Sequence, residues 1–358
     1  MHAIGTSDPA RPDREGLTMT DALLYADGSI STGIVPDLQL GPDDVAVAVA
    51  YTGICGTDLH IFHGDMDARV PKPLIPGHEM SGRIAECDSA VTGFEVGQPV
   101  TVMPIVSCGD CPACRDGNAH ICHTLRVLGV DGAGSMQSRW VVPATNLLPL
   151  PESLDLKSAA LVEPLAVAVH DVRRGGVEAG DHVLVVGGGP IGLLIALVAK
   201  HEGADVRLSE MDAERRRAAE SLGLTTIDPS AVVVPEEVGR WTDGVGADIA
   251  FEVSGAVAGV DSAVHSLAVR GRLVLVAIHP KPVPADLFRF FWRELTLIGA
   301  RLYDRTDFER AIELAASGSV PTASLVTGVV SMAEAQDAYR ALETGQGMKI
   351  LIDCQPQS

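Results

Sequence analysis

The sequence lacks any apolar run long enough to cross a membrane, and it is poor in aromatic and basic residues. Aromatic residues make up only 4% of the chain, and 27 Lys and Arg face 47 Asp and Glu, for a formal net charge of -20. A helical membrane span needs about 20 apolar residues, whereas the most apolar stretch, 183–198, is broken by Gly-Gly-Gly-Pro. Nucleic acids and anionic membranes would repel so acidic a chain. We therefore expect neither as a partner.

The N-terminus lacks the basic region and apolar block of a secretory signal. Residues 1–20 are mostly polar and rich in Pro and Asp, so we expect a disordered leader, with Met19 a candidate start of the ordered chain. Seven cysteines, four of them clustered, fit a reducing cytoplasm better than a disulfide framework. We expect a cytoplasmic protein in which Cys87 and Cys354 are plain buried thiols.

The chain has two regions with different secondary-structure patterns, which together predict an α/β fold. Up to about Pro151 it reads as short strands and loops, and beyond that point strands alternate with helices. Such alternation predicts a doubly wound parallel sheet. The predicted strands are 45–53, 99–107, 182–187, 205–210, 247–255, 271–278, 295–300 and 348–354, and the predicted helices are 156–174, 190–203, 213–223, 306–317, 332–343 and one ending near residue 268.

A glycine-rich loop follows the strand at 182–187 and opens the next helix. Gly187, Gly189 and Gly192 form G-x-G-x-x-G, with Pro190 and Ile191 between them. Such glycines let backbone amides approach a pyrophosphate at a helix N-terminus. The pattern therefore predicts a dinucleotide site.

Glu210 ends the following strand, where a carboxylate bonds the ribose 2′-hydroxyl and repels a 2′-phosphate. It favours NAD over NADP. Arg215, five residues further on, either lines the adenosine pocket or partly accommodates a phosphate. Ile278, at the end of the strand 271–278, is a further cofactor-binding candidate.

Four cysteines lie in one short segment with the spacing C-x2-C-x2-C-x7-C. Four thiolates this close can enclose one tetrahedral zinc ion. A metal held by four thiolates has no open position, so we expect a structural role. The acidic chain argues against a zinc-ribbon module that binds nucleic acid. The cysteines are Cys108, Cys111, Cys114 and Cys122.

A second metal site is indicated by Cys55, in a Gly-flanked turn, and His78-Glu79, in a loop stiffened by prolines. A thiolate with an imidazole selects zinc, and a carboxylate adds a third ligand or an outer partner. Asp58 is either an acceptor for the far nitrogen of His78 or a turn-forming residue. Glu163 begins a predicted helix beside a proline. It is either a residue of the metal site or a carboxylate that faces solvent.

The motifs GICGTDLH (53–60), PGHEMSG (76–82), the four-cysteine segment, VEPLAVAVH (162–170) and GGGPIG (187–192) occur in this order. With them the chain resembles the zinc-containing medium-chain alcohol dehydrogenases, in the polyol, butanediol and threonine dehydrogenase branch. The resemblance implies a β-rich GroES-like catalytic domain from residues 21–160 and 303–358, with a Rossmann NAD-binding domain at 161–302.

The resemblance also implies roles for residues. One catalytic and one structural Zn²⁺ are expected per subunit, the catalytic ion held by Cys55, His78 and either Glu79 or Glu163. Thr57 and His60 match the proton-relay positions, and Arg301 matches a position that bonds substrate hydroxyls. Ile61 stands where sorbitol dehydrogenase-like enzymes often carry an aromatic residue, which argues against sorbitol itself.

The expected activity is NAD-dependent oxidation of a secondary alcohol, on a vicinal diol or short polyol. One alternative is L-threonine 3-dehydrogenase, and another is a zinc- and NAD-binding protein without turnover. The predicted strand 295–300 offers an edge for pairing across a two-fold axis, so a homodimer or a dimer-built homotetramer is expected.

Overall fold

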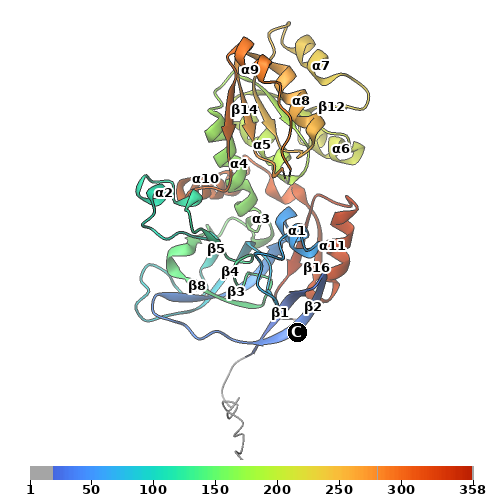
Figure 1. Ribbon diagram of the computed structural model, residues 1–358. Coiled ribbons are helices and arrows are strands. Elements are labelled where there is room, and N and C mark those ends of the chain that lie inside the picture. The colour runs from blue at the N-terminus through green and yellow to red at the C-terminus, as the bar shows by residue number, and fades with distance from the viewer. Residues whose placement is uncertain (1–18, 280, 357–358) are drawn as a thin grey trace, which may run out of the picture.

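The structure is a computed structural model that describes residues 19–279 and 281–356. One of its sheets combines strands from the N-terminal half of the chain with the last two strands of the chain. Its strand order is β16-β17-β3-β4-β5-β9, with β8 also paired to β3. The C-terminal strand β17 runs antiparallel to β3, so distant parts of the sequence share one sheet (Figure 1). The strands are β3 (Asp44–Gly53), β4 (Glu79–Cys87), β5 (Pro99–Val102), β8 (Arg139–Pro143), β9 (Leu147–Pro149), β16 (Val326–Ser331) and β17 (Lys349–Asp353).

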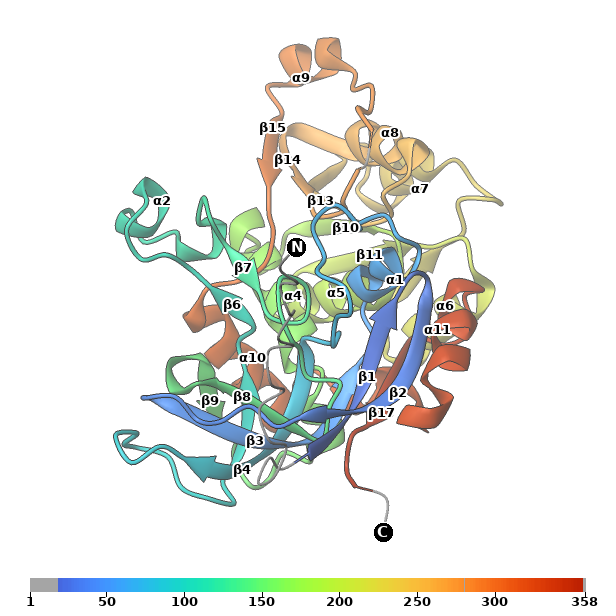
Figure 2. The same ribbon diagram turned by 60° about the horizontal axis from the view of Figure 1, so that its bottom comes forward.

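Two short antiparallel pairs flank this sheet. A hairpin joins β1 (Met19–Ala26) to β2 (Ser29–Pro36), and β6 (Ile105–Val106) pairs with β7 (Arg126–Val127) beneath the segment that carries the four cysteines (Figure 2). The expected leader, residues 1–20, lies outside the described residues except for Met19 and Thr20, which begin β1.

The second sheet is parallel and has six strands in the order β12-β11-β10-β13-β14-β15. The order reverses between β10 and β13, and ligands of open α/β sheets bind at the carboxyl ends of the strands at such a point. This confirms the predicted doubly wound sheet. Its strands are β10 (His182–Val186), β11 (Asp205–Ser209), β12 (Thr225–Ile227), β13 (Ala247–Glu252), β14 (Leu267–Leu275) and β15 (Thr296–Gly299).

Helices cover this parallel sheet, and two of them, α4 and α10, lie at the junction between the two halves of the molecule (Figure 1). No helix among the described residues is long and apolar enough to span a membrane. The α-helices are α1 (Gly56–Phe62), α2 (Pro112–Arg115), α3 (Leu156–Ala159), α4 (Val162–Gly175), α5 (Pro190–His201), α6 (Ala213–Ser221), α7 (Val234–Trp241), α8 (Val257–Ser266), α9 (Leu287–Arg293), α10 (Arg305–Ala316) and α11 (Ala335–Glu343). The 3₁₀ turns are η1 (Ala119–Ile121), η2 (Ala144–Asn146), η3 (Thr322–Leu325) and η4 (Met332–Glu334).

Prolines divide two segments that the sequence predicted as continuous. The helix expected at 156–174 is split into α3 and α4, because Pro164 has no N–H and is tolerated only in a first helical turn. The strand expected at 99–107 is split into β5 and β6, with Pro104 between them. Both differences arise because proline has no backbone N–H to donate, and the spacing of hydrophobic residues carries no information about backbone donors.

The buried carboxyl of Asp171 in α4 gives a first testable prediction. Its side chain is fully buried, and neither oxygen has a hydrogen-bond partner within residues 19–279 and 281–356. Burial, with a further contribution from Asp307, raises the pKa of Asp171 well above its ordinary value. In the unfolded chain the group ionises near pH ~3.9, so the native state loses stability as the pH rises above that value.

Asp171→Asn should therefore be more stable than the parent at pH 7, by about 1–3 kcal/mol. The gain should shrink as the pH falls through about 4, because well below that value both states of the parent carry the proton. Urea unfolding at several pH values measures it, with the exposed Asp116→Asn as control. A gain that does not change with pH would contradict the prediction.

Candidate active site and metal centres

Pairing of β3 with β4 brings the first candidate metal cluster together. Cys55, two residues after the end of β3, is the N-cap of α1. His78 directly precedes β4, and Glu79, the first residue of β4, pairs with Gly53 of β3. One ligand atom from each of Cys55, His78 and Glu79 lies within 4.8 Å of the others. The set of one thiolate, one imidazole and one carboxylate is a combination that suits zinc.

The surroundings of this cluster carry more negative than positive charge. Asp58 Oδ2 accepts a hydrogen bond from the Cys55 amide at 2.9 Å, and its other oxygen lies 3.8 Å from His78 Nδ1, beyond hydrogen-bond distance. Both of those facing atoms are buried and have no hydrogen-bond partner in the described part of the chain. Burial alone would lower the pKa of His78, but the charges of Asp58 and Cys55 raise it well above its ordinary value. An acidic, buried pocket of this kind fits a divalent cation.

Lys349 of β17 is the one buried cation that faces the cluster among the described residues. The residue is 2% exposed, and its ammonium group donates to both oxygens of Glu79, at 2.6 and 2.8 Å, and to the Ile54 carbonyl at 3.1 Å. Glu79 is therefore already neutralised by a lysine.

Glu163, in the first turn of α4, is buried, which excludes the solvent-facing alternative. Its Oε1 accepts a hydrogen bond from the Tyr303 hydroxyl at 2.7 Å. Burial first, and then the charge of Glu79, raise the pKa of Glu163 to about 7, against the opposing effect of His78. A second carboxylate thus faces the same cluster, with no ion pair of its own among the described residues.

Thr57 and His60 lie three residues apart on α1 and so share one face of that short helix. The His60 ring is half-exposed, and its Nδ1 lies 3.1 Å from Asp65 Oδ2. The helix thus leads from the buried cluster at Cys55 to a histidine in contact with solvent.

The four cysteines converge as their spacing predicted. Sγ–Sγ distances are 3.5 Å for Cys111–Cys114 and Cys108–Cys122, 3.8 Å for Cys111–Cys122 and 4.0 Å for Cys108–Cys114. A tetrahedron with Zn–S bonds of about 2.3 Å has edges of about 3.8 Å. Backbone amides of Asp110 and Cys111 lower the pKa of Cys108 to about 6, while burial raises that of Cys114 to about 11. The geometry fits zinc without rearrangement.

The glycine loop between β10 and α5 is shaped for a ligand. A Cβ on Gly192 would lie 1.9 Å from the Gly187 carbonyl oxygen, so close packing requires glycine there. A Cβ on Gly189 would meet nothing within 4 Å, although this residue caps α5 just before Pro190 and Ile191. The open space beside Gly189 is where a pyrophosphate would approach the helix N-terminus.

Glu210 follows β11 and faces this loop. Its carboxylate accepts hydrogen bonds from the amides of Gly188, at 2.6 Å, and Asp212, at 2.8 Å. The Nε atom of Arg215 is buried without a partner. Ile278, beyond β14, is 76% exposed.

Comparison with known proteins agrees with this geometry. Residues 41–152 match the alcohol dehydrogenase GroES-like domain, and residues 190–317 match the zinc-binding dehydrogenase domain. A 2-dehydro-3-deoxy-L-galactonate 5-dehydrogenase from Pseudoalteromonas atlantica is 45% identical over 91% of this chain and 97% of its own.

The chain belongs to the zinc-containing medium-chain alcohol dehydrogenase family.

Two solved structures extend the comparison. A zinc-binding dehydrogenase from Sinorhizobium meliloti 1021 bound to NADP has a TM-score of 0.89 at 33% identity, covering 94% of this chain and 99% of its own. The 2R,3R-butanediol dehydrogenase from Bacillus subtilis has a TM-score of 0.88 at 30% identity, covering 95% and 100%. The predicted family, fold and dehydrogenase class are thereby confirmed.

Two residues of this dehydrogenase that bond to the carboxylates of the site were not predicted from the sequence: Lys349, which contacts Glu79, and Tyr303, which contacts Glu163. Lys349 had a usable signal, since it is a lone cation in the apolar strand MKILIDC. Tyr303 had none, because nothing local places its hydroxyl on Glu163, 140 residues away. Arg301 lies between β15 and α10, two residues before Tyr303, and is exposed.

Proposed function

We propose that this dehydrogenase transfers hydride between NAD and a secondary alcohol or its ketone, with a vicinal diol or polyol as the alcohol. The observation that carries the proposal is the convergence of Cys55, His78 and Glu79 within 4.8 Å, at the end of α1 from which Thr57 and His60 extend. Intact ligand and relay positions argue against the alternative of a zinc- and NAD-binding protein without turnover.

The proposed catalytic ligands are Cys55 and His78 with one carboxylate. Glu163 is the better candidate for that carboxylate, because Lys349 already engages both oxygens of Glu79. When bound, zinc supplies Lewis-acid polarisation of the substrate oxygen, and the nicotinamide accepts hydride. Cys108, Cys111, Cys114 and Cys122 are proposed to hold a structural ion.

Thr57 and His60 are proposed to move the hydroxyl proton. The Thr57 hydroxyl would accept this proton from the substrate side as it gives up its own proton toward His60. His60 would in turn release a proton to solvent, since imidazole exchanges protons near neutral pH. Asp65, 3.1 Å from His60 Nδ1, orients the ring.

NAD is proposed as the cofactor because Glu210 borders the loop. Gly187, Gly189 and Gly192, with Pro190 and Ile191, would bind its pyrophosphate, while Arg215 and Ile278 would contact it further out. Glu210 would bond the ribose hydroxyls and repel a 2′-phosphate. The structure of the relative from Sinorhizobium meliloti holds NADP, so the preference needs a direct test.

Glu210→Ala is expected to raise KM for NAD about tenfold or more and to improve use of NADP. A hydrogen bond to a charged group contributes about 1.5–3 kcal/mol, and 1.4 kcal/mol corresponds to tenfold. Initial rates with each dinucleotide measure the switch. Glu214→Ala, an exposed carboxylate on α6, is the matched control; equal effects of both substitutions would refute the role of Glu210.

A polyol that also carries a carboxylate is the second candidate substrate. The structure gives Arg301 no ion pair and no hydrogen bond within residues 19–279 and 281–356, and a free guanidinium binds a carboxylate in two-point fashion. The 45% identical relative is named for a polyhydroxy acid, and the Bacillus subtilis neighbour for a vicinal diol.

A substrate panel tests the function. It contains 2,3-butanediol stereoisomers, C4–C6 polyols, aldonic acids and L-threonine, each with NAD and with NADP. We expect NADH formation with diols, polyols or their acids. Activity confined to threonine would establish the alternative of a threonine 3-dehydrogenase, and no turnover by zinc-replete protein would overturn the proposal.

A homodimer, or a tetramer built from it, is proposed to form along β15. This strand is the edge of the parallel sheet, and edge strands pair across two-fold axes. Beside it α9 exposes four large apolar side chains, among them Phe291 at 75% and Trp292 at 71%. Neighbouring exposed apolar side chains of this kind are typical of protein–protein interfaces, which supports the proposal.

Replacing both Phe291 and Trp292 by Asp should yield a folded monomer, because two charges would be buried in the interface. Light scattering measures the mass and circular dichroism the fold. Val96→Asp, at a residue 68% exposed far from α9 in sequence, is the control. A double variant with the parent mass would contradict this interface.

We also propose the division into a catalytic part, 21–160 with 303–358, and a dinucleotide part, 161–302. The shared sheet of β3 and β17 supports it. A cytoplasmic location is proposed because the four-cysteine cluster and Cys55 need reduced thiols to bind metal.

A further inference from the structure

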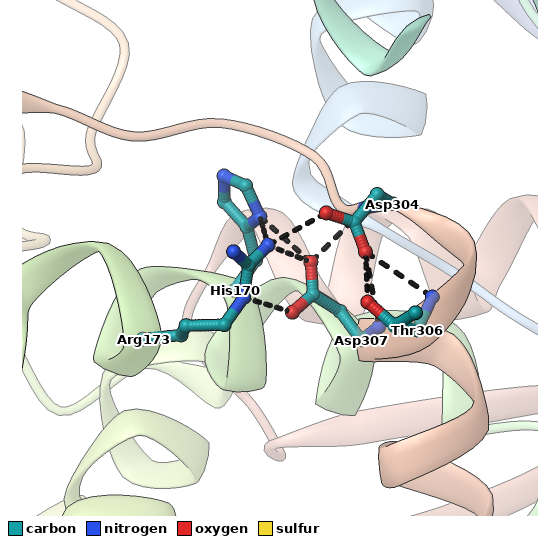
Figure 3. A network of polar contacts seen from close by, with 5 residues as sticks. All are labelled: His170, Arg173, Asp304, Thr306 and Asp307. Carbon is teal, nitrogen blue, oxygen red and sulfur yellow. Dashed lines mark hydrogen bonds and ion pairs between the residues drawn. The ribbon is translucent and has the colours of Figure 1, made fainter. Parts of the chain in front are cut away.

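A polar cluster at the start of α10 joins this helix to α4, away from the proposed metal ligands. Arg173 of α4 donates from Nε to Asp307 Oδ1 at 2.7 Å and from Nη2 to Asp307 Oδ2 at 2.8 Å. The same Nη2 reaches Asp304 Oδ2 at 2.7 Å. Figure 3 shows Arg173 and His170 facing the two aspartates, with Thr306 on the far side, bonded to Asp304.

We call the cluster of His170, Arg173, Asp304 and Asp307 the clamp, because its bonds hold α10 to α4; it is not a metal site. Ligand atoms of His170, Asp304 and Asp307 lie within 4.8 Å of one another, which resembles a metal site. The guanidinium of Arg173, however, already supplies the positive charge, with a two-point bond to Asp307. Such paired bonds fix orientation as well as charge.

The clamp holds the first turn of α10 in place. Asp304 caps the helix by accepting from the amides of Thr306 and Asp307, at 3.1 and 3.3 Å, and Asp307 accepts in return from the Asp304 amide at 3.0 Å. His170 Nδ1 also lies 2.8 Å from Asp307 Oδ2. Both aspartates are therefore fixed to α4 and to their own helix at once.

Tyr303 directly precedes this cap and reaches back to the active site. It is fully buried, and its ring packs edge-on against Phe308 at 5.0 Å between centroids. Its hydroxyl donates to Glu163 at 2.7 Å. Leu302 before it has a φ of +56°, a left-handed conformation that turns the chain sharply at this point.

Glu163 and Arg173 lie near opposite ends of α4, and both bond to the same short segment, residues 303–307. Ten residues of helix separate them, about 15 Å along the axis. Among the described residues, the Tyr303 hydroxyl makes the one hydrogen bond that joins residues 300–303 to α4, so the clamp and this bond together orient the segment. On this geometry, and resting on the proposed function, we propose that Arg173 and Tyr303 are positioning residues: the clamp fixes Tyr303, and Tyr303 fixes the carboxylate of Glu163 beside the catalytic metal.

A double-mutant cycle tests the proposal, using Arg173→Gln, Tyr303→Phe and the combination. Tyr303→Phe keeps the ring against Phe308 and removes only the hydroxyl. Arg310→Gln, an arginine on α10 that is about as exposed as Arg173 but pairs with Glu313 and Glu202, is the control.

The first readout needs no substrate: the rate at which a chelator removes zinc, taken from the kinetic phase that is absent in Cys55→Ala. Loss of a partner that orients a ligand costs about 10–100-fold in metal affinity or activity. Tyr303→Phe should therefore speed this phase about tenfold, and Arg173→Gln by a smaller factor. The second readout is turnover, where kcat should fall more than KM rises.

The double variant distinguishes an effect of Arg173 that acts through Tyr303 from two independent effects. If Arg173 acts through Tyr303, adding Arg173→Gln to Tyr303→Phe should change neither readout further. Effects that multiply in the combination would overturn the proposal, as would an Arg173→Gln protein that behaves like Arg310→Gln. An enzyme without turnover would refute the proposed function, yet the zinc-release cycle would still test the clamp.

Discussion

Replacing Cys55 by alanine is expected to lower kcat/KM by about 10³-fold or more. Lewis-acid stabilisation by a bound metal contributes several kcal/mol, and each 1.36 kcal/mol corresponds to tenfold in rate. His78 and a carboxylate alone do not complete the usual three-ligand set of a catalytic zinc. The purified variant should also contain about one zinc ion fewer per subunit, measured by elemental analysis alongside initial rates.

The control for this substitution is Cys87→Ala. Cys87 is a half-buried thiol at the end of β4 that belongs to neither of the two proposed metal sites. It should keep the parent zinc content and rate. A Cys55→Ala protein that retains both would show that the cluster at 55, 78 and 79 is not the catalytic centre.

Lys349→Met is expected to destabilise the protein by about 3–5 kcal/mol, because it leaves the buried carboxylate of Glu79 without its cation. Lys349 and Glu79 are 2% and 1% exposed, so water cannot replace the lost partner. The denaturant midpoint of the zinc-replete protein measures the loss.

A second substitution separates the charge from the packing. Adding Glu79→Gln should recover much of the lost stability, since removing both charges of a buried pair costs far less than removing one. Arg340→Met, which breaks the exposed pair with Asp337, is the control and should change stability by less than about 1 kcal/mol. A Lys349→Met protein as stable as the control would contradict the buried ion pair.

Short motifs let the sequence predict the parts of the site that depend on local chain geometry. The spacing of Cys108, Cys111, Cys114 and Cys122 brings their sulfurs together within one lobe. The glycine loop likewise follows from one strand and one helix, and Glu210 lies at the next strand end. In each case few residues separate the partners, so the pattern itself contains the geometry.

The long-range contacts could not be predicted in this way. Lys349 reaches Glu79 because β17 pairs with β3, and Tyr303 reaches Glu163 because α10 packs against α4. The sequence separations are 270 and 140 residues. Each contact depends on packing of whole elements, and single-chain periodicity says only that those elements are amphipathic. The division of the helix expected at 156–174 has a local cause, Pro164, that periodicity overlooks.

The most direct test of the central claim is NADH formation by the zinc-replete enzyme, before and after a chelator and again after added zinc, with the best substrate of the panel. The account predicts that activity disappears with the chelator and that zinc restores it, in the parent but not in Cys55→Ala. Turnover that persists after the catalytic zinc has been removed would contradict the assignment of this cluster as the catalytic centre.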